Sequence, residues 1–213
     1  MSRARTVYAA VVAFAAGLAA AHTVTDGFEA FTLESARRLH ALRTPALDRG
    51  LELELADRGT SRLSGIPGQV LLVDFIYASC ATRCAALGSL YAQLEEALAA
   101  EIDSGAVRLL SVSFDPERDG PEALRAYRTR HAPGAHGWEI GRPAGAEATR
   151  AWLDAFGVVV IPDRLGGYTH NAAVHVVDAE RRLIAIVDPQ DLGEIVRLAR
   201  RTAGINVINV AKR

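Results

Sequence analysis

The chain has 213 residues, half of them hydrophobic, and a formal net charge of -1. This near-neutral balance, without a basic stripe, argues against nucleic acid as a partner. Length and composition are typical of one soluble domain with a short appendage. The chain has only two cysteines, and their close spacing favours redox or metal chemistry over a disulfide framework.

The N-terminal segment predicts export. Arg3 and Arg5 precede an uncharged stretch, residues 6–25, whose centre at residues 7–21 is apolar and rich in alanine. Two interpretations stay open: a signal peptide cleaved after the small residues 19–21, or an uncleaved anchor with its arginines on the cytoplasmic side. A buried core helix is the third interpretation, which the basic flank disfavours.

We expect three parts along the chain: a signal anchor or signal peptide at 1–25, a connecting helix and linker at 26–48, and the exported domain at 49–213. The connecting helix should begin after Thr32, a plausible N-cap, and stop at Pro45.

The domain alternates strands and helices. Residues 51–55 alternate with period two, which predicts a strand with one wet face, and residues 70–78 form a continuous apolar run, which predicts a strand buried on both faces. A helical pattern follows at 87–98, and 107–114 is a second apolar strand. Strand, helix and strand in this order predict a parallel βαβ unit.

The second half continues with shorter elements. We expect helices near 121–131 and 146–156, extended pieces at 138–140 and 158–161, a loop at 166–171, a hairpin of 172–178 with 183–188, and a final helix capped by Asp191.

The two cysteines lie where the buried strand turns into the helix. Cys80 and Cys84 are four residues apart, so both sulfur atoms can lie on one side of the first helical turn. The helix N-terminus and Arg83 favour the thiolate form. Two such donors suit Cu(I), zinc or a redox disulfide, and a structural staple is the weaker alternative because so short a loop constrains the unfolded chain little.

Other polar residues receive plainer interpretations. Asp74, in the buried strand, is either a proton acceptor for a buried thiol or a hydrogen-bonded strand residue. Asp115 and Asp119 lie at the same sheet edge as the cysteines, and we interpret them as turn and cap residues. His175 should face away from His170, and the other four histidines are interpreted as surface residues.

The order of elements predicts an α/β, thioredoxin-like fold with a central mixed sheet flanked by helices. Three motifs resemble the SCO/SenC family of copper-handling thioredoxin-like proteins: Asp-Phe-Ile-Tyr leading into Cys80-x-x-x-Cys84, Asp-Pro-Glu-Arg-Asp at 115–119, and Tyr-Thr-His-Asn-Ala-Ala at 168–173. The resemblance covers about residues 51–203.

The resemblance implies copper, as Cu(I) or Cu(II), bound by Cys80, Cys84 and His170. It also implies a domain held on the outer, periplasmic face of a bacterial inner membrane. Its partner would be cytochrome oxidase subunit II or another copper or thiol client, whose dinuclear copper site the protein would help to assemble. A histidine on the loop that contains Gly166 and Gly167 would be able to swing and release the metal.

Two departures from the family pattern keep other functions open. Ala81 stands where the family usually has proline, and Thr82 and Arg83 replace an acidic residue. The more positive local field helps a thiolate nucleophile. The alternative is therefore a periplasmic thiol-disulfide oxidoreductase in which Cys80 and Cys84 are the redox pair, and a third possibility is a redox or copper sensor.

Overall fold

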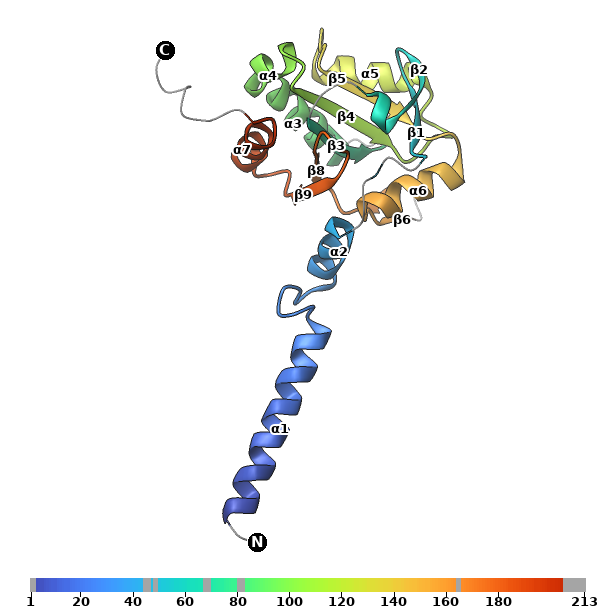
Figure 1. The fold of residues 1–213 in the computed structure, drawn as a ribbon. Coiled ribbons are helices and arrows are strands. Elements are labelled where there is room, and N and C mark those ends of the chain that lie inside the picture. Colours follow the sequence, from blue (N-terminus) through green and yellow to red (C-terminus); the bar gives the residue numbers. More distant parts are fainter. Residues whose placement is uncertain are drawn as a thin grey trace. The chain divides into compact units, whose positions relative to one another are not determined.

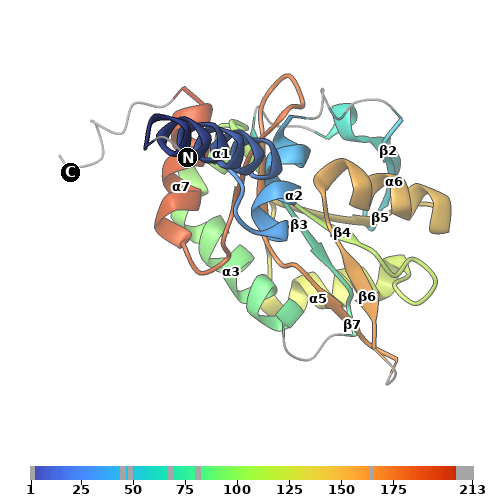
Figure 2. The ribbon, with the colours of Figure 1, turned by 90° about the horizontal axis from the view of Figure 1, so that it is seen from below.

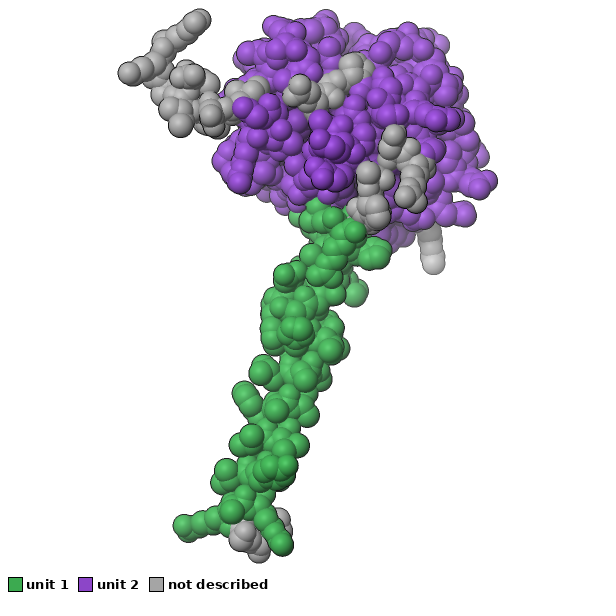
Figure 3. All heavy atoms as spheres, viewed as in Figure 1, with its two compact units in different colours: residues 1–43 green, residues 44–213 purple. Residues whose placement is uncertain are grey.

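The computed structural model describes residues 3–43, 47, 50–66, 70–79, 83–163 and 166–204, without the side chains of 83–85. The chain forms two compact units, residues 1–43 and residues 44–213 (Figure 3).

The first unit begins with a long apolar helix, α1 (Arg3–Val24). It is long and apolar enough to cross a membrane, although a signal sequence near the N-terminus has the same properties. None of its residues is buried.

A second helix, α2 (Leu33–Leu42), follows in the same unit and begins as the sequence predicts. The hydroxyl oxygen of Thr32 accepts a hydrogen bond from the backbone nitrogen of Ser35 at 3.0 Å, which makes it the N-cap. The predicted stop at Pro45 lies outside the described residues.

The second unit is built on a seven-stranded mixed sheet with the order β2-β1-β5-β4-β3-β8-β9 (Figure 1). Its strands are β1 (Glu52–Leu55), β2 (Gly59–Arg62), β3 (Val70–Ile76), β4 (Val107–Ser113), β5 (Trp138–Arg142), β8 (Val174–Val177) and β9 (Leu183–Val187). A separate two-stranded sheet, which we call the histidine ribbon, pairs β6 (Val160–Pro162) with β7 (Tyr168–His170).

The central strands are those with the continuous apolar runs. β3 is buried along its whole length, and it pairs in parallel with β4 over seven residue pairs, from Val70 opposite Val107 to Ile76 opposite Ser113. β5 continues the parallel part, while β1 and β8 join antiparallel. The predicted βαβ unit and the predicted β8–β9 hairpin are both confirmed.

Helices cover both faces of this sheet (Figure 2). α3 (Arg83–Ala97) packs against α5 (Pro121–His131) and α7 (Leu192–Thr202) on one face, with the short α4 (Ala99–Asp103) following α3. The other face carries α6 (Ala146–Phe156), whose Phe156 ring lies 5.2 Å from the ring of Phe75. The fold is therefore the predicted thioredoxin-like α/β arrangement.

Two details of the sequence interpretation need correction. β2 was not predicted, and it pairs with β1 in an antiparallel hairpin. The predicted loop at 166–171 is wrong, because Tyr168–His170 forms β7 and pairs antiparallel with β6, with His170 opposite Val160. The predicted cap of the last helix is confirmed, since Asp191 accepts a hydrogen bond from the backbone nitrogen of Glu194 at 3.0 Å.

Candidate metal and thiol site

The cysteine loop, residues 80–84, joins the end of β3 to the start of α3. Cys80 lies outside the described residues, whereas Cys84 belongs to the first turn of α3, although its side chain is not described. The predicted position of the pair between a buried strand and a helix is thus confirmed for the backbone of Cys84. The first turn of a helix presents unpaired N–H groups and a positive dipole end, which stabilise a thiolate.

His170 is the last residue of β7 and is buried, with 3% of its surface exposed. The sequence placed it on a glycine-flanked loop, and this is wrong. Its backbone belongs to the histidine ribbon, in which the next residue also takes part, because Asn171 Oδ1 accepts a hydrogen bond from the nitrogen of Val159 at 2.6 Å. The imidazole is therefore held by an ordered element.

An aromatic cluster lies beside this histidine and contacts it through Phe114. The ring of Phe114 lies 5.1 Å from the imidazole, and it also lies 5.4 Å from the ring of Tyr168 and 5.4 Å from that of Tyr77. The rings of Tyr77 and Tyr168 are 5.2 Å apart and perpendicular. Rings in such tilted and edge-to-face arrangements attract one another, so the cluster fixes the imidazole against the end of the sheet.

A hollow of about 430 Å³ joins the histidine to the cysteine helix. Its wall includes His170 together with Ala86 and Leu87, which follow Cys84 by two and three residues. The segment Asp188–Gln190 also lines it. Tyr77, which precedes the cysteine loop in the sequence, contacts the histidine ribbon through the ring of Tyr168. Both flanks of the cysteine loop therefore approach the ribbon that contains His170.

Asp119 has a role that the sequence interpretation missed. It was expected to cap α5, but Gly120 is the N-cap of that helix. Asp119 is 2% exposed, and its Oδ2 accepts hydrogen bonds from the backbone nitrogen of Ala78 at 2.8 Å and from the hydroxyl of Ser113 at 2.6 Å. Burial raises the pKa of Asp119, and both hydrogen bonds oppose this rise.

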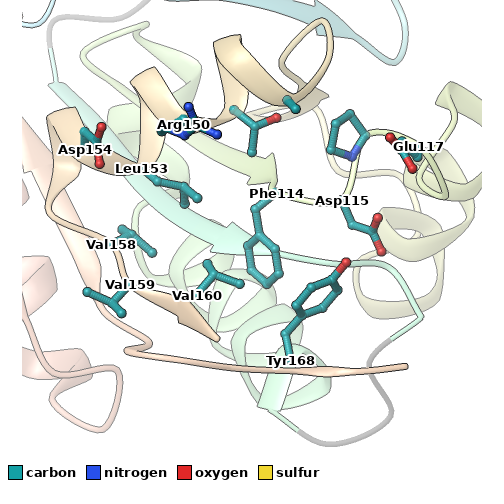
Figure 4. A pocket seen from close by; sticks show the side chains of 13 residues that line it. Phe114, Asp115, Glu117, Arg150, Leu153, Asp154, Val158, Val159, Val160 and Tyr168 are labelled. Atoms are coloured by element: carbon teal, nitrogen blue, oxygen red, sulfur yellow. The ribbon is translucent and has the colours of Figure 1, made fainter. Parts of the chain in front are cut away.

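Asp115 lies in a turn, as predicted, and its Oδ2 accepts a hydrogen bond from Arg118 Nε at 2.5 Å. It also lines a second hollow, of about 550 Å³, which the sequence did not predict (Figure 4). In this view Phe114, Asp115 and Tyr168 lie together at one side, and Arg150 and Asp154 project from α6 at the other.

Asp74 lies in β3 and is fully buried. Its Oδ1 accepts a hydrogen bond from Ser111 Oγ at 2.5 Å, and the same hydroxyl oxygen accepts from Trp138 Nε1 at 2.9 Å. Burial raises the pKa of Asp74 to about 7, although the bond from Ser111 opposes the rise. Burial, followed by the nearby Asp74, raises the pKa of Tyr91 well above its usual value.

The other histidines of the domain lie in different surroundings. His175 is buried in β8, its Nδ1 is 3.2 Å from the carbonyl oxygen of Val73, and its ring contacts Phe75 and Phe156. His136 is exposed, as predicted, and its Nε2 lies 2.8 Å from Asp103 Oδ1.

Of the three expected donors, Cys80, Cys84 and His170, only His170 has its side chain among the described residues. Two thiols and one imidazole suit copper, because soft sulfur donors favour Cu(I) and an imidazole is also a good ligand for Cu(II). A buried histidine on an ordered ribbon, beside a hollow that reaches the cysteine helix, fits this donor set. The same cysteine pair can also form a disulfide, so the arrangement suits metal binding and thiol exchange.

A family model and a relative of known sequence both match this chain, and both point to the same family. The family model described as SCO1/SenC matches residues 56–204. A SCO1 protein homolog of Bacillus subtilis (strain 168) is 35% identical over 79 residues, which cover 37% of this chain and 39% of that relative.

Solved structures show the same fold. Bradyrhizobium japonicum ScoI with copper bound has a TM-score of 0.59 and 20% identity, over 71% of this chain and 96% of that chain. BsSco, described as a member of the Sco family of cytochrome c oxidase assembly proteins with a disulfide switch, has a TM-score of 0.63 and 19% identity, over 76% of this chain and 95% of that chain.

Proposed function

The chain belongs to the SCO1/SenC family, and we propose that it binds copper through Cys80, Cys84 and His170 and passes the metal to a client protein. The observation that carries the proposal is the shared hollow, whose wall includes His170 and the first turn of the helix that contains Cys84. Copper bound to a related protein of the same fold supports the choice of metal.

In this proposal copper is cargo, and the cysteines and His170 have different roles in binding it. Thiolates at the start of α3 hold Cu(I), while His170 adds a nitrogen donor with which Cu(II) is also bound. A swinging loop does not release the metal, because His170 is part of the histidine ribbon. Instead, we propose that a client side chain enters the hollow beside His170 and that ligands are exchanged there one at a time.

The client would have its own copper or thiol site. A relative of the same fold is described as belonging to a family of cytochrome c oxidase assembly proteins, which supports a client in the assembly of that oxidase. Within that pathway we propose subunit II, whose dinuclear copper site needs both the metal and reduced cysteines.

The experiment that tests copper binding replaces both cysteines. The full chain in mild detergent is loaded with Cu(I) under reductant and desalted, and its metal content is measured. We expect one copper per parent chain and none in the Cys80→Ser/Cys84→Ser variant, because these are the only two thiols in the sequence. His136→Ala is the control and should retain the metal. A parent chain without copper, or a double variant that keeps it, would contradict the proposal.

Thiol-disulfide exchange is the second candidate, and the buried Asp74 favours it. Asp74 precedes Cys80 by six residues in the strand that leads to the cysteine loop, and with a pKa of about 7 its carboxyl group can take up or release a proton at neutral pH. If the desalted parent holds no copper but rapidly reduces a disulfide-bonded peptide, this function replaces copper delivery. The same Cys80 and Cys84 would then be the catalytic pair.

We propose that α1 anchors the chain in a bacterial inner membrane with the domain in the periplasm. Its apolar, unburied surface and the preceding arginines support an anchor in this orientation. In spheroplasts of a bacterial host, external protease should digest the domain while a cytoplasmic marker stays intact, and alkaline carbonate should leave the undigested chain in the membrane pellet. A domain that is protected in spheroplasts would contradict the orientation.

A further inference from the structure

The loop between β4 and α5, residues 115–119, contacts both halves of the candidate site, and we call it the clamp loop. Its first contact is with the cysteine side. Asp119 accepts the backbone N–H of Ala78, two residues before Cys80, and the hydroxyl of Ser113 anchors the same carboxylate oxygen to the end of β4. The bond joins residues 41 positions apart, it is part-buried and its acceptor Asp119 is buried, so it fixes where the chain leaves the sheet toward Cys80.

Its second contact is with the histidine side. Arg118 Nη1 donates a hydrogen bond to the carbonyl oxygen of Gly166 at 2.7 Å, and its guanidinium carbon lies 5.3 Å from the centroid of the Tyr168 ring. The carboxylate of Asp115 holds the same guanidinium at Nε, and Figure 4 shows Asp115 beside Tyr168. A guanidinium fixed on three sides in this way can position the turn that leads into β7.

We propose that Arg118 and Asp119 are positioning residues that set the separation between the cysteine loop and His170. The inference rests on the proposed function, and it adds a role for two residues that need not touch the metal. Adjacent residues hold opposite sides of the site, so the clamp loop ties the two sides to each other. Ligands held at the correct separation before the metal arrives lose less conformational freedom on binding, which raises affinity.

The test compares Arg118→Ala with Arg197→Ala. Both arginines are exposed and pair with an acidic residue three positions earlier, Asp115 and Glu194, but Arg197 reaches neither side of the site. Cu(II) affinity of the full chain is measured by competition with a chelator, and the coordination is read from the electron paramagnetic resonance spectrum.

We expect Arg118→Ala to weaken Cu(II) binding by about 10–100-fold, the usual effect of losing an outer-shell partner, and to give a spectrum with more than one species. The urea midpoint from tryptophan fluorescence should stay at the parent value, because an exposed ion pair adds little stability. Arg197→Ala should match the parent in all three measurements. An Arg118→Ala variant with the parent's affinity and spectrum would overturn the proposal.

Asp119 supplies a readout that does not need copper. Asp119→Ala removes the acceptor for the Ala78 N–H, whereas Asp119→Asn keeps an oxygen at that position. We expect the alanine variant to change the equilibrium constant for oxidation of Cys80 and Cys84 by glutathione about tenfold, and the asparagine variant to restore it toward the parent.

Copper binding and the thiol oxidation equilibrium together distinguish failure of the proposed function from failure of the clamp-loop proposal. A parent chain that binds no copper refutes the proposed function, and the thiol equilibrium still tests the clamp loop. Unchanged equilibrium constants in Asp119→Ala, with the parent's spectrum in Arg118→Ala, would refute the clamp loop alone.

Discussion

Replacing Asp74 by asparagine is expected to stabilise the domain at pH 8 and to leave its stability at pH 4 close to that of the parent. The folded parent keeps the proton on Asp74 up to a pKa of about 7, whereas an aspartate exposed to water in the unfolded chain has a pKa of 3.8. Between these values the folded state binds one more proton than the unfolded state, so stability falls as the pH rises. The total loss is about 4 kcal/mol, at about 1.4 kcal/mol per pH unit.

Asparagine mimics the protonated acid and can still accept the bond from Ser111, so the variant should lack this part of the pH dependence. Urea unfolding of the full chain in detergent can be followed by tryptophan fluorescence, because both tryptophans, Trp138 and Trp152, are buried in the domain. Asp154→Asn, at an exposed position on α6, is the control and should follow the parent curve. If the free energy of unfolding fell equally in the parent and in Asp74→Asn between pH 4 and pH 8, the raised pKa of Asp74 would be contradicted.

Replacing His170 by alanine is expected to weaken Cu(II) binding at least about 100-fold and Cu(I) binding less. Removing a residue that only hydrogen-bonds to a metal ligand already lowers metal affinity about 10–100-fold. Removing the nitrogen ligand itself should lower it more. Cu(I) depends chiefly on the two sulfur donors, so its affinity should fall less than that of Cu(II). Chelator competition in each oxidation state measures both effects.

The matched control is His136→Ala, which removes an exposed histidine that lies beside Asp103. It accounts for adventitious binding of Cu(II) to surface imidazoles and should leave both affinities unchanged. If His170→Ala bound copper as tightly as the parent in both oxidation states, the imidazole would have to be dropped from the ligand set.

The central strands and most helices follow directly from the sequence pattern. β3 and β4 are mostly apolar along their length, as a strand covered on both faces requires. α6 has the predicted bounds because its pattern ends at Gly157, which adopts a left-handed conformation with φ of 63° as the C-cap.

β7 could not be predicted in this way. Three residues are too few to show a period of two, and this strand exists because it pairs with β6. The sequence motif identified His170 as a candidate ligand, but only the pairing shows that it is held in a ribbon.

The role of Asp119 was missed for a related reason. Turn and cap preferences describe hydrogen bonds between near neighbours, whereas the partner of Asp119 is the backbone of Ala78, 41 residues away. The sequence indicated that the two loops share an edge of the sheet, but the bond between them depends on the register of β3 and β4.

The account's central claim is that two sulfur atoms and the imidazole of His170 bind the same copper ion. X-ray absorption at the copper K edge of the Cu(I)-loaded full chain tests it most directly. We predict two sulfur ligands and one imidazole nitrogen in the parent, with the imidazole signal absent in His170→Ala. A parent spectrum without the imidazole, or a His170→Ala spectrum that retains it, would contradict the claim.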